Sequence, residues 1–299
     1  MTPPRHGVKG IKVLVRPQHK GAAGSSHPVQ LFDFKARNPC SRKPPSAILV
    51  QLREVRIQDS SMVDIHCHII PGVDDGSRSW DMTREMCRVA ADDGVRHIVA
   101  TPHCNHEYSY SREQYEELKD QLHKASEGCI EFSIGCDFHF SFENITDAIE
   151  NPKRYSINGT RYLLIEFSDY GIPPNVAELL FLFTSRGMVP IVTHPERNPL
   201  LVRRPEKILE LVDAGALVQV TANSITGFWG EQARSVSEWL LAQGTVHVIA
   251  SDAHDPKRRR PVLSEARDAV ARMLGEQAAE DLVSNTPKAI VEGRSLPLG

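Results

Sequence analysis

The stretch Val63-Asp64-Ile65-His66-Cys67-His68, followed by Asp74-Asp75-Gly76, decides what this chain can form. An apolar, β-type run ends in two histidines that are two residues apart. Because successive side chains of a strand point to opposite faces, His66 and His68 share one face and Cys67 takes the other. Two imidazoles beside carboxylates on a glycine-containing turn predict a metal site. Two histidines hydrogen-bonded to the backbone would give the same local pattern.

The same arrangement recurs along the chain. Short, mostly β-branched apolar runs at 97–102, 130–135, 162–165, 189–193 and 246–251 are followed by His103, Asp137, Glu166, His194 and Asp252, with His254 two residues further on. Residues 216–222 supply one more strand. The ranges with helical periodicity are 80–93, 111–126, 175–186, 205–214, 231–243 and 263–274. Alternating strands and helices predict an α/β fold with seven parallel strands and helical crossovers. Such nearly continuous apolar strands suit either a sheet covered on both faces or a closed β/α barrel. The active site of such a barrel lies at the C-terminal ends of its strands.

Length and composition agree with a globular barrel. The 299 residues, 40% hydrophobic and 24% charged, accommodate one barrel of about 230–250 residues and an extension. No apolar run approaches the ~20 residues that span a bilayer. The six cysteines form no Cys-x-x-Cys pair, which predicts reduced thiols in a cytoplasmic protein rather than a disulfide framework.

Residues 1–61 differ from the rest of the chain. They hold 11 Lys/Arg and 3 Asp/Glu, a formal charge of +8, which leaves −11 for residues 62–299. Their proline, glycine and serine content and lack of sustained periodicity predict a disordered basic extension. Met62 is then the expected natural start of a folded domain spanning 62–299. The basic extension leaves a nucleic-acid-binding arm as a less favoured alternative.

Five motifs together carry a family resemblance. They are Asp64-Ile65-His66-Cys67-His68 with Val73-Asp74-Asp75-Gly76, Ala100-Thr101-Pro102-His103, Leu164-Ile165-Glu166-Phe167, Thr193-His194-Pro195-Glu196-Arg197 and Ala250-Ser251-Asp252-Ala253-His254. In this order, over residues 62–292, the chain resembles the polymerase-and-histidinol-phosphatase (PHP) superfamily. Within it, the chain most resembles the manganese-dependent protein-tyrosine phosphatases of bacterial capsular and exopolysaccharide gene clusters. The resemblance implies a distorted seven-stranded β/α barrel.

The resemblance also implies a site with three metal ions. Carried over by position, its ligands are His66, His68, Asp75, His103, Asp137, Glu166, His194, Asp252 and His254. The family commonly has glutamate where this chain has Asp137, which is one methylene shorter. Asp74 is expected to orient a neighbouring ligand, and His139 could contribute a further one. Imidazole and carboxylate ligands suit Mn²⁺, Fe²⁺ or Zn²⁺, and the resemblance implies Mn²⁺.

The expected chemistry is hydrolysis of a phosphate monoester. A hydroxide bridging the metals would attack phosphorus in line. Aryl phosphates are the easier substrates, because a phenol leaving group has a pKa near 10. By resemblance, Arg197 and Arg259 bind the phosphate; arginine's planar fork matches phosphate oxygens. The choice among Arg258, Arg259 and Arg260 stays open.

Three functions remain in view. The first is a protein-tyrosine phosphatase acting, by resemblance, on the phosphotyrosine tail of a bacterial tyrosine kinase that controls polysaccharide synthesis, with peripheral contact to that membrane kinase. The second is a histidinol-phosphate or other small-molecule phosphatase, and the third a non-catalytic, metal-stabilised domain. None of the cysteines has an arginine six positions on, which excludes a cysteine-based phosphatase loop, and no Walker-type loop is present. The sequence leaves the oligomeric state open.

Overall fold

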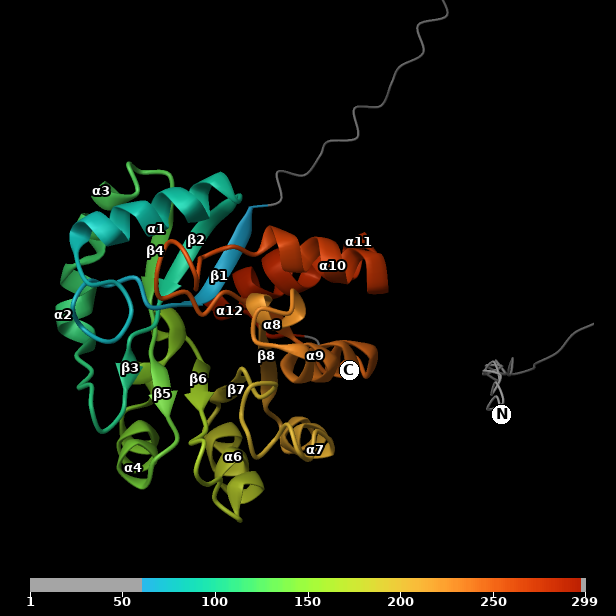
Figure 1. Cartoon of the computed structure of the whole chain (residues 1–299). Coiled ribbons are helices and arrows are strands. Elements are labelled where there is room, and N and C mark those ends of the chain that lie inside the picture. Colours follow the sequence, from blue (N-terminus) through green and yellow to red (C-terminus); the bar gives the residue numbers. More distant parts are fainter. Residues whose placement is uncertain (1–60, 297–299) are drawn as a thin grey trace, which may run out of the picture. The chain divides into compact units, whose positions relative to one another are not determined.

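The computed structural model describes residues 61–296, so the prediction of a basic extension falls on residues outside the described part. The strands are β1 (Met62–Cys67), β2 (Val95–Ala100), β3 (His103–Cys104), β4 (Glu131–Ile134), β5 (Asp137–His139), β6 (Tyr162–Glu166), β7 (Val189–Thr193), β8 (Leu217–Thr221) and β9 (Val248–Ala250). All paired strands are parallel, in the orders β1-β2-β4 and β3-β5-β6-β7-β8-β9. Helices surround these strands (Figure 1).

Nine strand segments form seven strands of a barrel. β2 and β3 are two parts of one predicted strand interrupted at Thr101-Pro102, where proline lacks an N–H. β4 and β5 are likewise interrupted at Gly135-Cys136. The N–H of Asp137 donates to the carbonyl of Pro102 at 3.1 Å, so the pairing continues past the breaks. The ring closes where the N–H of Asp252 donates to the carbonyl of His66 at 2.8 Å. The prediction of a distorted seven-stranded barrel is confirmed.

The predicted helices occur within one or two residues of their expected bounds, with one correction. The helices are α1 (Trp80–Asp92), α2 (Arg112–Glu117), α3 (Lys119–Ala125), α4 (Phe142–Glu150), α5 (Pro152–Tyr155), α6 (Val176–Ser185), α7 (Glu206–Asp213), α8 (Ala222–Ile225), α9 (Glu231–Ala242), α10 (Ser264–Leu274), α11 (Glu276–Glu280) and α12 (Thr286–Val291). A short 3-10 helix, η1 (Ile157–Gly159), and a π-helix, η2 (Asp281–Asn285), complete them. The range 111–126 is two helices, because the N–H of Leu118 bonds three residues back, to Tyr115, which tightens the turn. No helix within residues 61–296 is long and apolar enough to cross a membrane.

The strands are buried on both faces over most of their length, as their nearly continuous apolar sequences predict, although Arg96 of β2 and Glu131 of β4 are exposed. In β6, Leu163 and Ile165 belong to a large cluster with residues of the helices, whereas Leu164 belongs to a smaller cluster with Leu217 of β8. Two residues after Leu164 comes Glu166, so strand alternation puts this carboxylate on the face of the smaller cluster. The smaller cluster therefore forms an apolar floor under the polar residues at the C-terminal ends of the strands.

Candidate metal centre

The loop after β1 folds back over the histidine pair. The N–H of Ser77 donates to the carbonyl of His68 at 3.0 Å, and a Cβ on Gly76 would lie 2.2 Å from that oxygen. Glycine is therefore required at position 76. This close approach puts Asp74 against His68, where its Oδ2 lies 2.7 Å from His68 Nδ1. The expectation that Asp74 orients a neighbouring imidazole agrees with this contact.

His66 and His68 converge through their outer ring nitrogens. Their Nε2 atoms are 3.2 Å apart, and each lies 3.5 Å from Oδ1 of Asp252. The Nδ1 of His66 lies 3.0 Å from Oε1 of Gln219 in β8. A hydrogen on Nδ1 would donate to this amide oxygen and leave Nε2 as a lone-pair donor, which is the arrangement a metal ligand needs.

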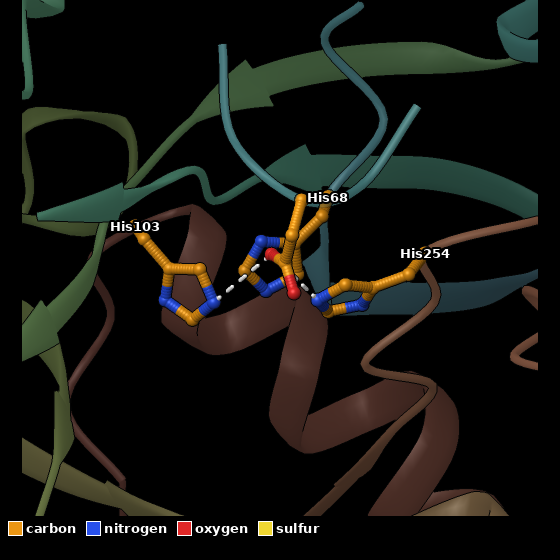
Figure 2. A group of neighbouring side chains, drawn as sticks. His68, His103 and His254 are labelled. Atoms are coloured by element: carbon orange, nitrogen blue, oxygen red, sulfur yellow. Dashed lines mark ion pairs between the residues drawn. The ribbon is translucent and has the colours of Figure 1, made fainter. Parts of the chain in front are cut away.

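A second group forms beside this pair. His103 and His254 lie with Nε2 atoms 3.4 and 3.3 Å from Oδ1 of Asp75. Figure 2 shows these two histidines on either side of His68, and its dashed lines mark their ion pairs. The ring centroids of His68 and His254 are 3.9 Å apart. Four side chains from three separate segments thus point their donor atoms at one space.

The third group lies on the other side of His103. Its Nδ1 is 3.2 Å from Oδ2 of Asp137 and 3.7 Å from Oε2 of Glu166. His194 approaches the other oxygen of Glu166 at 3.7 Å. Both His194 and Asp252 have positive φ, 35° and 51°, a conformation that costs energy for residues other than glycine. The backbone is held in this strained form directly after β7 and β9.

Three sets of donor atoms, each within 4.8 Å of one another, meet the spacing of a metal site among the described residues. They are His68-Asp75-His103-His254, His66-His68-Asp137 and His103-Asp137-Glu166. The shared members join the sets into one centre. His194 and Asp252 fall outside these sets but contact their members. The structure therefore brings together all nine residues that the family resemblance implies, and places His139 near them, 3.8 Å from Glu166.

The chemistry of Asp137 fits a bound cation. Its side chain is completely buried, and neither oxygen accepts a hydrogen bond within the described part of the chain. Burial would raise its pKa, but the neighbouring His66 and His103 hold the pKa well below its usual value. A buried carboxylate is costly unless it is paired or bound to a metal. Asp137 is thus an ionised group with lone pairs free for a metal.

The pKa values of His66 and His103 show the same need for positive charge. Burial opposes protonation of His66, but Asp137 and Asp252 outweigh it and raise the pKa to about 9. Burial is likewise outweighed at His103, where Asp137 and Asp75 raise the pKa to about 12. The carboxylates of this centre stabilise positive charge on the neighbouring histidines, and bound metal ions would supply that positive charge in place of protons.

Two arginines adjoin the centre through Asp252. Nη2 of Arg197 and Nη2 of Arg259 both donate to Oδ2 of Asp252, the latter at 2.7 Å. The guanidinium carbons lie 4.6 and 5.5 Å from the ring centroid of Trp229, within the range of cation–π attraction. The Nε of each arginine is buried without a hydrogen-bond partner in residues 61–296. Of the three consecutive arginines, Arg259 is the one that lines the cavity of the site.

A cavity of about 360 Å³ opens over these groups. Its lining includes Asp75, Glu166, His194 and His254 together with Arg197, Arg259 and Trp229. The predicted metal ligands and the two arginines predicted to bind phosphate therefore face one space. The arrangement can hold a phosphate group between cations and guanidinium groups.

Sequence reasoning missed several polar residues that support the site. Gln219 contacts His66, and Glu196 is fully buried and accepts from the N–H of Thr221 at 3.0 Å and from Ser224. Asp64, also fully buried, accepts from the N–H of Ser251 at 3.0 Å. A polar residue inside an apolar strand is the signal that could have indicated Gln219 and Asp64. Trp229 carried no signal, because its position depends on a loop.

Comparisons with known proteins agree with this geometry. A family model described as capsular polysaccharide synthesis, CpsB/CapC, matches residues 62–292. The chain is 32% identical over 228 residues to the tyrosine-protein phosphatase YwqE of Bacillus subtilis, covering 75% of this chain and 89% of YwqE. It is 36% identical over 209 residues to the putative tyrosine-protein phosphatase CapC of Staphylococcus aureus, covering 68% and 81%.

A solved structure is similar as well. It is one of the crystal structures of YwqE from Bacillus subtilis and CpsB from Streptococcus pneumoniae, which are described as unique metal-dependent tyrosine phosphatases. The TM-score is 0.74 at 30% sequence identity, and the match covers 79% of this chain and 96% of the other. The similarity therefore includes the whole barrel.

Proposed function

The chain belongs to the CpsB/CapC family of capsular polysaccharide synthesis, and on that premise we propose that it removes phosphate from the phosphotyrosine tail of a bacterial tyrosine kinase. It is a metal-dependent tyrosine-protein phosphatase. The finer proposal concerns its substrate, its residues and its metal. A cytoplasmic location is part of it, since Cys67, Cys87, Cys104, Cys129 and Cys136 are free thiols.

The position of Asp252 is the observation that carries the proposal. Its Oδ1 faces the Nε2 atoms of His66 and His68, while its Oδ2 accepts from Arg197 and Arg259. One buried carboxylate thus joins the histidine centre to the arginine pair. A phosphate group in the adjoining cavity would contact both, with its charge neutralised from two sides.

The nine donor residues would hold three metal ions, and Mn²⁺ is the proposed ion. The ligands are His66, His68, Asp75, His103, Asp137, Glu166, His194, Asp252 and His254. When bound, the metal ions supply Lewis acidity, which lowers the pKa of water and stabilises negative charge on phosphoryl oxygens. The shorter side chain of Asp137 is compensated by its location, since its Oδ2 lies 3.2–3.5 Å from both His103 and His66.

The chain's own residues orient the substrate. Arg197 and Arg259 present planar donor groups to the cavity, and Trp229 packs against both guanidinium groups and limits their rotation. Phosphate bound there has its phosphorus directed at the histidine centre. A tyrosine leaving group departs as a phenolate with little need of a proton, because the pKa of phenol is about 10. This favours aryl over alkyl phosphates.

The proposal is tested by turnover of Mn²⁺-loaded protein on a phosphotyrosine peptide, measured beside histidinol phosphate. We expect preference for the peptide, loss of turnover with chelator, and loss of turnover in His66→Ala with an unchanged circular dichroism spectrum. Arg272→Ala, on the outer helix α10, is the matched control and should retain activity. Preference for histidinol phosphate would move the enzyme to small-molecule substrates, and an active His66→Ala would refute the assigned centre.

A further inference from the structure

We propose that the groove between α6 and α7, beside the catalytic cavity, binds an apolar residue and an acidic residue that flank phosphotyrosine in a peptide substrate. The assignment rests on the proposed function of the metal centre. The groove has a volume of about 570 Å³. Ile172, Val176 and Leu200 contribute apolar walls, and Arg203 and Arg204 contribute a basic edge. We call these residues the α6–α7 groove; the two helices lie next to each other in Figure 1.

The groove adjoins the catalytic cavity. The buried side chain of Leu201 lines both. Arg203 lines the groove and also a third hollow of about 270 Å³, whose other walls include Arg197 and Trp229. A chain whose phosphotyrosine occupies the catalytic cavity would therefore lie across Leu201 and place a neighbouring residue in the groove.

The groove is held in shape before any peptide binds. Asn198 is buried, and its amide donates to the carbonyls of Phe167 and Ser168 at 3.4 and 3.2 Å. Its oxygen accepts from the N–H groups of Leu200 and Leu201 at 3.0 and 3.2 Å. One side chain thus fixes the loop after β6 against the loop after β7. A preformed surface spends less free energy on ordering when a ligand binds.

Charge identifies the flanking residue as acidic. Residues 62–299 carry a net charge of −11, so this basic edge contrasts with the negative charge of the domain as a whole. Arg203 and Arg204 are exposed, and no ion pair joins either to a carboxylate within residues 61–296. Lys207, by contrast, is paired with Glu210 at 2.7 Å. Two unpaired guanidinium groups beside an apolar wall suit an Asp or Glu side chain next to an apolar one.

The test uses phosphotyrosine peptides that differ only in the flanking charge. Three peptides carry Leu beside phosphotyrosine and then Glu, Gln or Lys, and p-nitrophenyl phosphate serves as the substrate without flanks. For the wild type we expect kcat/KM to be highest for the Glu peptide, lower for the Gln peptide and lowest for the Lys peptide. In the double variant Arg203→Glu/Arg204→Glu, kcat/KM should fall at least about tenfold more for the Glu peptide than for p-nitrophenyl phosphate. This variant should now prefer the Lys peptide.

A second variant tests the apolar wall. Ala177→Trp would fill the groove from α6 without changing charge, and should reduce kcat/KM for the Leu-containing peptides more than for one with Gly in place of Leu. Arg272→Glu on α10, a single charge reversal far in sequence from the groove, is the control, and it should change neither the Glu-to-Lys preference nor the Leu-to-Gly preference. Equal kcat/KM for the Glu and Lys peptides in the wild type, or equal losses on every substrate in folded variants, would overturn the groove assignment. Failure of the Mn²⁺-loaded wild type on all phosphotyrosine peptides would instead refute the proposed function.

Discussion

Replacing Gln219 with leucine should weaken metal binding without unfolding the barrel. Gln219 is completely buried, and its Oε1 lies 3.0 Å from Nδ1 of His66. Leucine has nearly the same volume, so packing against the neighbouring strands is kept. It leaves the Nδ1 hydrogen of His66 buried without an acceptor, which costs about 1–3 kcal/mol. The imidazole can relieve this cost by rotating or by moving its hydrogen to Nε2, and either change removes the lone pair that faces Asp137 and Asp252.

The expected magnitude follows from the same contact. Since about 1.4 kcal/mol corresponds to a factor of ten, Gln219→Leu should need about 10–100 times more Mn²⁺ for half-maximal activity. The assay is phosphatase activity against Mn²⁺ concentration in a metal buffer, together with direct competition against a chelator. Gln219→Glu keeps an acceptor and should lie closer to the wild type, and Gln121→Leu on the exposed face of α3 is the control. An unchanged Mn²⁺ requirement in Gln219→Leu would refute the role assigned to Gln219 in orienting His66.

Three further predictions concern other parts of the chain. Trp229→Ala should raise KM for p-nitrophenyl phosphate by roughly 5–30-fold with a smaller change in kcat, because two cation–π contacts of about 0.5–1 kcal/mol each are lost. Trp229→Phe should recover part of the lost affinity, and a fall in kcat alone would contradict this role. Deleting residues 1–61 should leave kcat/KM unchanged, and a large loss would make them part of the enzyme. In EDTA, the melting temperature should fall as pH rises from about 6.5 to 9. In the folded protein the pKa of His66 is about 9 and that of His103 about 12, both above the usual 6.5 of an unfolded chain. Protonation of these two histidines therefore stabilises the fold below pH 6.5, and this stabilisation is lost as the pH rises. With metal bound the slope should reverse, since protons compete with metal for imidazole; equal slopes would argue against metal at these residues.

Much of the fold was predictable because its signals are local. Apolar runs such as 189–193 followed by a polar residue identify buried parallel strands, and periodic segments such as 231–243 identify the covering helices. The interruptions at Thr101-Pro102 and Gly135-Cys136 were not predicted, although proline and glycine were visible there. Whether such residues end a strand or only bend it depends on the neighbouring strands. The division of 111–126 into two helices was missed for a similar reason, since its periodicity continues through Leu118.

The sequence by itself determined the type of site. Strand alternation puts His66 and His68 on one face, and parallel strands bring the residues at their C-terminal ends, such as His103 and Asp252, to one rim. The tertiary structure alone decided how these groups combine. Gln219 meets His66 across 153 positions of sequence, Trp229 packs on two arginines from different loops, and Asn198 fixes the wall of the α6–α7 groove. Such contacts depend on loop conformation and on the closure of the barrel between β9 and β1. Periodicity along the chain carries no information about either, because it reports only which face of its own element a side chain occupies.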